Sequence, residues 1–324
     1  MKSLMDNASV REQYYLDAVI ALHEKEGDEG VAAHNKILLA VLNEYPDEIE
    51  ARLFLWTQLD GGYDAQGDPK AEQLYAQLLL EREFENHGDH QGLIHYWIHS
   101  QEPGPHPDSA LEAAQKLARL APNSGHIVHM PGHIHYLMGN YAEAHDQFSK
   151  SEDADARYMA SYDIEPIFTW NYLHNFSFMM SNLAEAGRYQ EGARYAGKLA
   201  KLTEESSFKH LPGFEMLLGR AIMEQAYMAM RLEQFELAAT LLGDPRWDAW
   251  EKTDGLQALQ EAYLAYSAGM AAVQKDELES AERFSRKLDS ILWRSERDEA
   301  RLSYRTRPLQ IAALELHGVV AAAN

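Results

Sequence analysis

Two pairs of histidines constrain this chain more than any other feature of its sequence. His95 and His99 are four residues apart, and so are His129 and His133. Residues at this spacing lie one turn apart on the same face of an α-helix. The second pair repeats the first after 34 residues, because this interval separates His95 from His129 and His99 from His133. An internal repeat of that length predicts stacked helix–turn–helix units, in which equivalent positions lie side by side.

The rest of the chain also favours helices over strands. Alanine, leucine, glutamate, glutamine and methionine are abundant, whereas valine, isoleucine and threonine are sparse. We therefore predict an all-α solenoid of tetratricopeptide repeats (TPRs), a helix–turn–helix superhelix with about 5–7 repeats over residues 1–324. Within this single array we expect N-terminal repeats in 1–90, histidine-bearing central repeats in 91–205 and C-terminal repeats in 206–324. Residues 151–165 depart from the repeat and predict an insertion, either about one helix or a long loop.

Glycine and proline predict where the helices are interrupted. The segment Gly27–Gly30 predicts a turn between the first two helices. Pro131 falls inside the helix that carries the second histidine pair, and an interior proline removes a backbone hydrogen bond and bends a helix. Pro308 is expected to bend or divide the final helix for the same reason.

Charge and composition exclude several classes of function. The net charge is −22, which disfavours nucleic acid and anionic membranes as partners, since both select basic surfaces. The sequence has no apolar run long enough to span a membrane and no apolar signal core near its start, so we expect a cytoplasmic protein. Cysteine is absent, which rules out disulfides and thiolate ligands.

The repeat register places more histidines on the face that carries the two pairs. The second helices of five repeats align at small residues, which are Ala110, Ala144, Gly192, Ala238 and Ala281. Positions 11, 15 and 18 residues earlier share one face of each first helix, and first helices line the concave groove of a TPR array. The histidines at these positions are His95, His99, His126, His129, His133 and His174.

Such a cluster predicts a metal site. Neutral imidazole is the commonest protein metal ligand, and pairs four residues apart on a helix are a standard chelating geometry. With nitrogen ligands and no thiolate, the candidate ions are Fe, Cu, Zn and Mn, with Ni a further option. The number of ligands allows one metal with an open coordination position or two metals a few ångströms apart.

Other polar groups are candidates for supporting roles. The catalytic candidates are Tyr96, Tyr136 and Glu165, as acid–base groups or carboxylates. Glu102 is a further carboxylate candidate. Groups expected around the metal or along the groove are Asp163, Tyr172, Arg220, Tyr227 and Tyr266.

Two segments resemble a large group of bacterial TPR proteins. The segments are Asp89-His-Gln-Gly-Leu-Ile-His-Tyr-Trp-Ile-His99 and Leu120-Ala-Pro-Asn-Ser-Gly-His-Ile-Val-His-Met-Pro-Gly-His-Ile134, followed by His174-Asn175. The group carries a His-Tyr-x-Ile-His and His-x-x-His-Met-Pro-x-His-Ile signature, and the resemblance extends over residues 10–205. It implies the TPR fold, and it implies that His90 joins the six groove histidines in one functional set. Gly132 and His135 depart from the signature, which more often has Ser or Ala and Tyr or Phe there.

Three functions remain open. The first is a metal-dependent enzyme that acts on a small molecule in the groove. The predicted ligands are nearly all histidine and no carboxylate is clearly placed as a general base, which slightly favours oxidative chemistry over hydrolysis. The second is a scaffold that binds a protein or peptide partner, as many TPR arrays do. The third is a metal carrier or sensor. In the structural alternative, the histidines only hydrogen-bond one another or satisfy the backbone near Pro131.

Overall fold

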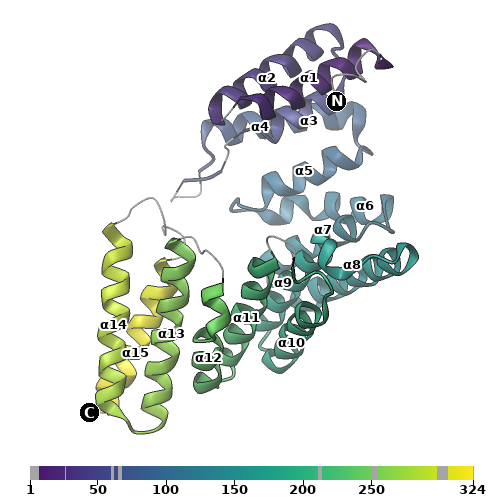
Figure 1. Ribbon diagram of the computed structural model, residues 1–324. Coiled ribbons are helices and arrows are strands. Elements are labelled where there is room, and N and C mark those ends of the chain that lie inside the picture. Colours follow the sequence, from purple (N-terminus) through teal and green to yellow (C-terminus); the bar gives the residue numbers. More distant parts are fainter. Residues whose placement is uncertain are drawn as a thin grey trace. The chain divides into compact units, whose positions relative to one another are not determined.

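The computed structural model describes residues 7–25, 27–59, 62–64, 68–210, 214–249, 254–297 and 306–323. In these ranges the secondary structure is helical apart from one isolated antiparallel bridge, between Tyr63 and Pro69, so the predicted all-α class is confirmed. The α-helices (Figure 1) are α1 (Val10–Glu24), α2 (Gly27–Glu44), α3 (Ile49–Trp56), α4 (Ala71–His87), α5 (Gln91–Gln101), α6 (Leu111–Leu120), α7 (Gly125–Leu137), α8 (Tyr141–Tyr162), α9 (Trp170–Glu185), α10 (Tyr189–Glu205), α11 (Phe214–Arg231), α12 (Phe235–Leu242), α13 (Asp254–Gln274), α14 (Leu278–Arg297) and α15 (Thr306–Ala323). Short 3-10 helices are η2 (Pro107–Ala110), η3 (Pro166–Phe168) and η4 (Pro245–Ala249).

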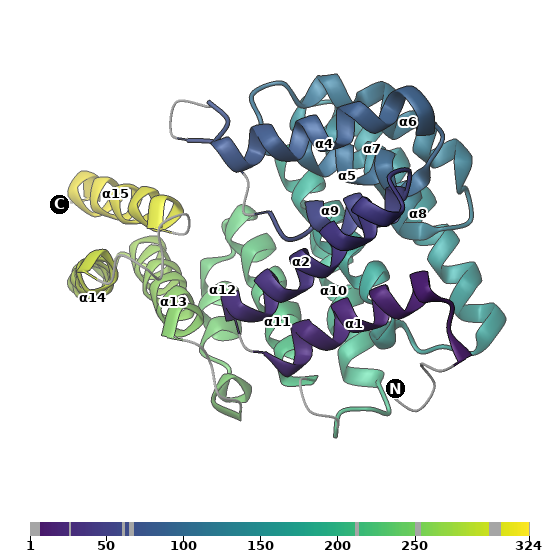
Figure 2. The ribbon, with the colours of Figure 1, turned by 90° about the horizontal axis from the view of Figure 1, so that it is seen from above.

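The chain divides into two compact units, residues 1–154 and 155–324. Within each unit a helix packs mainly against its neighbour in sequence, as expected for helical repeats. In the first unit α1 and α2 lie side by side in both views (Figures 1 and 2). In the second unit α13 packs against both α14 and α15. The single continuous solenoid over the whole chain stays a prediction.

The register inferred from the sequence is visible in the burial of the aligning residues. Each of these small residues belongs to the second helix of a pair or to the turn that starts it, and each is buried. They are Ala110, Ala144, Gly192, Ala238 and Ala281. At Gly192 an added Cβ atom would lie 2.7 Å from the Met228 sulfur, so a side chain there would require Met228 on α11 to move. The first helices of the pairs are therefore α5, α7, α9, α11 and α13.

The prediction of a turn at Gly27–Gly30 is wrong, because all four residues belong to the first turn of α2. Gly27 is the first residue of this helix and has a φ of +55°, a left-handed conformation that glycine adopts without strain. Gly30 lies within α2, where an added Cβ atom would come within 2.7 Å of the Lys25 carbonyl oxygen.

The extra length at 151–165 is helical and takes the form of a longer partner helix. Helix α8 has 22 residues and continues without a break from Tyr141 to Tyr162. It ends where Asp163 adopts a φ of +52°. A separate inserted helix or long loop is therefore not what the structure shows, because added turns of α8 account for the segment.

The two prolines differ in their effect. Pro131 lies inside α7 as predicted, and its missing N–H removes the helical hydrogen bond to the carbonyl of Ile127. The prediction that Pro308 bends or divides the last helix is wrong, because Pro308 lies in the first turn of α15. A first-turn residue needs no N–H donor for the helix, so proline is tolerated there.

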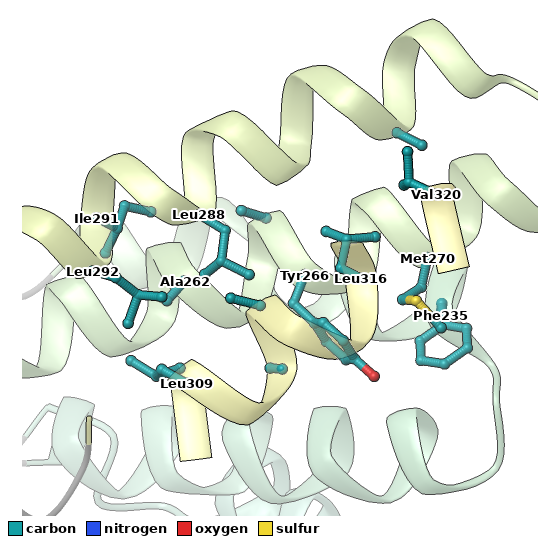
Figure 3. Packing of buried hydrophobic residues seen from close by; sticks show 14 of the residues in the cluster. Phe235, Ala262, Tyr266, Met270, Leu288, Ile291, Leu292, Leu309, Leu316 and Val320 are labelled. Atoms are coloured by element: carbon teal, nitrogen blue, oxygen red, sulfur yellow. The ribbon is translucent and has the colours of Figure 1, made fainter. Parts of the chain in front are cut away.

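The C-terminal helices share an apolar core, which also explains the position of one predicted groove residue. Side chains from α13, α14 and α15 interdigitate around Leu288 and Leu316, both fully buried (Figure 3). Tyr266 points into this core, next to Phe235, at a ring separation of 5.9 Å. Burying this apolar surface is the main stabilising term for such a helix layer.

A search of the described residues finds no helix with the length and apolar character that crossing a membrane requires.

Candidate metal centre

Helix α5 presents its histidines opposite an apolar face. Leu93, Ile94 and Ile98 are fully buried in the core of the first unit. His95 and His99 each follow one of the two isoleucines by one residue, so they lie together on the adjoining, partly buried face. The apolar contacts of α5 thus fix the direction in which both imidazoles point.

Helix α7 buries its histidines more deeply. His129 is 1% exposed and His133 is 5% exposed. Gly132 lies between them, and a Cβ atom at this position would overlap the ring of Phe148 on α8. The Phe148 ring also lies 4.9 Å from the His129 ring. The glycine therefore allows an aromatic side chain to pack directly beneath the second histidine pair.

Three imidazoles from α5 and α7 converge. One nitrogen from each of His95, His99 and His126 lies within 4.8 Å of the other two. The Nε2 atoms of His95 and His126 are 2.9 Å apart, and the rings of His95 and His99 are separated by 4.6 Å. An ion held at about 2.0–2.1 Å by three imidazoles needs its ligand nitrogens roughly 3–3.5 Å apart. The 2.9 Å between His95 and His126 is already close to this value, and the His99 nitrogen lies within 4.8 Å of both.

The second histidine pair adjoins this group. The Nε2 atoms of His129 and His133 are 2.5 Å apart. The His133 ring lies 6.0 Å from that of His99, and the His129 ring lies 6.2 Å from that of His126. Five imidazoles from two helices therefore form one contiguous cluster in the first unit, which we call the histidine cluster: His95, His99, His126, His129 and His133.

Glu102 joins the two helices of the histidine cluster. It is the C-cap residue of α5. His99 Nδ1 donates to its Oε2 at 2.6 Å, and His133 Nδ1 donates to its Oε1. Burial alone would raise the pKa of Glu102, but the hydrogen bonds from His133 and His99 outweigh burial and hold this pKa below its usual range.

The environment keeps His95 neutral. Burial, followed by the charges of His99 and His126, lowers the pKa of His95 to about 3. A metal binds the neutral form of imidazole, so this residue is already in the ligand form across the physiological pH range.

His90 has a structural role at the start of α5. Its Nδ1 accepts from the backbone N–H of Leu93 at 3.3 Å, which makes His90 the N-cap of the helix. Its Nε2 donates to Glu50 Oε1 at 3.0 Å. Both ring nitrogens are thus engaged in starting α5 and anchoring it to α3, whereas the resemblance places His90 in the functional set.

The two tyrosines predicted as catalytic groups have different surroundings. The Tyr96 ring packs 4.7 Å from Trp56 and 5.4 Å from His95. Burial, followed by the charge of Glu50, raises the pKa of Tyr96, so its hydroxyl keeps its proton. Tyr136 lies beside Tyr141, with ring centres 6.1 Å apart.

Predicted residues around η3 have structural contacts within the second unit. Glu165 accepts hydrogen bonds from the hydroxyls of Ser206, at 3.0 Å, and Ser207, at 2.6 Å. These bonds hold the end of α10 against η3. The Ser207 hydroxyl is the main reason that the pKa of Glu165 is lowered. Asp163 is exposed and occupies the left-handed position that ends α8.

Helix α9 holds two further predicted residues. Tyr172 is buried in the core of the second unit, where its ring lies 4.9 Å from Phe176. His174 is half-buried and stacks on Trp170 at 4.7 Å, with Phe178 at 4.9 Å. Tyr172 thus packs with the core and not along an open groove, and a metal-binding role for His174 stays a prediction.

The predicted groove positions of the C-terminal repeats contain hydrogen-bonded groups. Arg220 on α11 donates to the Ser177 hydroxyl on α9. The rings of Tyr227 and Tyr263 meet nearly at right angles, with centres 5.1 Å apart. The hydroxyl of Tyr266 donates to Glu315 on α15 at 2.8 Å.

Two residues that the sequence analysis did not single out, Glu224 and Phe148, have notable surroundings in the structure. Glu224 lies one turn after Arg220 on α11, where burial raises its pKa to about 7 although the charge of Arg220 lowers it. Its spacing to Arg220 was the available signal. Phe148 packs against α7 at Gly132 and beside His129. The glycine within a helix was the available signal, because it leaves room for a large side chain.

Comparison with known proteins supports the fold. No known family model and no curated protein matches the sequence. Among solved structures, the chain is similar to a tetratricopeptide repeat protein from Parabacteroides merdae ATCC 43184, with a TM-score of 0.56 and 13% identity. The alignment covers 95% of this chain and 99% of that one. At such low identity the likeness shows the fold alone, and this chain therefore has the fold of a TPR protein.

Proposed function

We propose that the chain binds a transition-metal ion through His95, His99 and His126 and uses it to transform a small molecule. The observation that carries the proposal is the convergence of three imidazole nitrogens within 4.8 Å. Imidazole nitrogens favour Zn, Cu and Fe over the hard cations Mg and Ca, and Mn stays a weaker candidate. Three ligands from the protein would leave a coordination position for water or substrate.

The surroundings of the cluster favour oxidative chemistry over hydrolysis. A hydrolase needs a general base that accepts a proton near neutral pH. The carboxylate at the cluster, Glu102, already accepts two hydrogen bonds from His99 and His133, and its pKa is held below the usual range. A carboxylate in this state is a weak base. A redox-active ion such as Fe or Cu would not require such a base.

Two other functions are alternatives to the enzyme. The likeness to a TPR protein supports a scaffold that binds a protein or peptide partner. A metal carrier or sensor would use the same histidine cluster without turnover. Titration with metal, followed by an assay for oxidation of small molecules by the loaded protein, separates a carrier from an enzyme. A cytoplasmic location stays a prediction.

The decisive experiment is metal analysis of matched variants of the full chain. Plasma mass spectrometry would measure Fe, Cu, Zn and Mn in the purified wild type, in a His95→Ala/His126→Ala variant and in a His23→Ala/His106→Ala control. The control removes two exposed histidines that lie outside the cluster. We expect about one ion or more per chain in the wild type and control, and loss in the cluster variant at unchanged helical content.

One result would overturn the proposal. If the wild type holds no metal after incubation with each of the four ions, the cluster is a hydrogen-bonded structural element. The scaffold function would then stand in first place.

A further inference from the structure

Glu102 accepts hydrogen bonds from two different helices of the histidine cluster, one through each carboxylate oxygen. We propose that Glu102 is a positioning residue that sets the tautomer of two rings in the histidine cluster, those of the proposed ligand His99 and of its neighbour His133. This inference rests on the proposed metal function. It assigns to Glu102 neither contact with the ion nor a part in proton transfer.

The contacts themselves fix the arrangement. Oε2 of Glu102 lies 2.6 Å from Nδ1 of His99 on α5, and Oε1 meets Nδ1 of His133 on α7. Glu102 is the C-cap residue of α5, and its side chain is only 16% exposed. Each oxygen serves one imidazole, and a single side chain orients one ring on each helix.

Proton counting then determines which nitrogens remain for a metal. A carboxylate is ionised at neutral pH and can only accept hydrogen bonds. Both Nδ1 atoms must therefore carry hydrogen. In a neutral imidazole the other nitrogen, Nε2, then carries the lone pair, so His99 would bind an ion through Nε2. In His133 the lone pair on Nε2 faces Nε2 of His129 at 2.5 Å, so it accepts a hydrogen bond from that ring.

The tautomer matters because free neutral histidine prefers hydrogen on Nε2. Without Glu102, the His99 ring would have to change tautomer or orientation before it could present Nε2 to an ion. Metal-binding histidines commonly donate their second N–H to a carboxylate, and loss of such a partner typically weakens metal binding about 10–100-fold. Sharing one carboxylate further makes the ligand geometry depend on the register between α5 and α7.

The chain offers a matched control for this role. Glu50 also accepts a hydrogen bond from a histidine, His90, at the other end of α5. Glu50→Gln replaces the carboxylate in a histidine pair that lies outside the histidine cluster. Glu102→Gln presents an amide in place of one oxygen, which cannot accept from both Nδ1 atoms. Glu102→Asp keeps the charge and tests whether reach alone is sufficient.

The experiment combines side-chain NMR with metal titration of the full chain. Long-range ¹H–¹⁵N spectra of the metal-free protein, assigned with His99→Gln and His133→Gln, report which ring nitrogen carries hydrogen. Titration with Co(II) and Zn(II) reports affinity. For the wild type and Glu50→Gln we expect Nδ1-protonated His99 and His133. For Glu102→Gln we expect loss of that signature in at least one ring and Zn(II) binding weakened about 10–100-fold, with partial recovery in Glu102→Asp.

The possible failures can be told apart. If the wild type binds Zn(II) and Glu102→Gln retains both the tautomers and the affinity, this inference is overturned while the proposed function stands. If the wild type binds neither Co(II) nor Zn(II), this inference is overturned, and the proposed function is overturned with it if Fe, Cu and Mn also fail to bind. Circular dichroism on every variant ensures that a change in affinity is not a loss of folding.

Discussion

The Nε2 atoms of His95 and His126 lie 2.9 Å apart, although the two residues belong to different first helices, α5 and α7. In the repeat register they stand 15 and 18 residues before the aligning position. Ser177 and Arg220 in the second unit occupy the same two positions of successive repeats, and they are also joined by a hydrogen bond. The offset between first helices is thus the same at both junctions. The residue types placed there decide whether a junction can hold a metal.

The buried position of His95 makes the metal-free protein sensitive to acid. The pKa of His95 is lowered from 6.5 to about 3 in the folded chain, mainly by burial. Between these values the unfolded chain binds a proton that the folded chain does not. Stability from this residue is therefore complete above the unfolded pKa and is lost as the pH falls toward the folded one, by up to about 1.4 kcal/mol per pH unit.

Urea unfolding at about pH 7 and about pH 5 checks this expectation. The wild type should lose more unfolding free energy on acidification than His95→Gln, which cannot take up the proton. His23→Gln, at an exposed position of α1, should behave as the wild type does. Equal losses in the wild type and His95→Gln would show that His95 titrates normally.

A side chain at position 132 is expected to destabilise the fold, because the Phe148 ring lies against Gly132. Gly132→Ala would push a methyl group into the Phe148 ring, and overpacking of this kind costs about 1–3 kcal/mol of unfolding free energy. Gly197→Ala, in the middle of α10 with open space around it, should instead stabilise by up to about 1 kcal/mol, because alanine is the better helix former. Denaturant unfolding measures both.

A double-mutant cycle tests whether the ring is the cause. Phe148→Leu alone should also destabilise, since it leaves a space beneath α7. Combined with Gly132→Ala, the loss should be smaller than the sum of the two single losses, because the methyl group then fills part of that space. Strict additivity would mean that the two positions do not share a contact.

Spacing predicted the histidine cluster because helix period and repeat period are both local properties of a sequence. Four-residue intervals put His95 with His99, and the 34-residue interval put α5 beside α7. The contribution of Glu102 was harder to single out, because it depends on how the chain turns at the end of α5. A carboxylate three residues after His99 was one of several candidates, and its contact with His133 is set by the neighbouring helix.

Contacts between distant helices explain why other predicted groove positions are covered. Tyr266 has the register of a groove residue, but α15 packs over α13 and supplies Glu315 as its partner. Tyr172 on α9 is likewise buried in the core of the second unit, to which α10 contributes Leu199 and α11 contributes Ala221. Repeat spacing identifies the face of a helix. It does not reveal which later helix closes over that face.

Substitution of His90 distinguishes a residue that stabilises α5 from a residue that binds the metal. It caps α5 through Nδ1 and reaches Glu50 through Nε2. His90→Ala should lower the unfolding free energy by about 1 kcal/mol, as loss of a helix cap commonly does. His90→Asn should recover most of that loss, since asparagine is a good cap. Metal content, measured by plasma mass spectrometry, should stay at the wild-type level in both, whereas His95→Ala should lose metal.

Loss of metal in His90→Asn at wild-type stability would instead place His90 in the metal site, as the resemblance implies. The two measurements together decide between the roles, because a cap acts on the stability of α5 and a ligand acts on the ion.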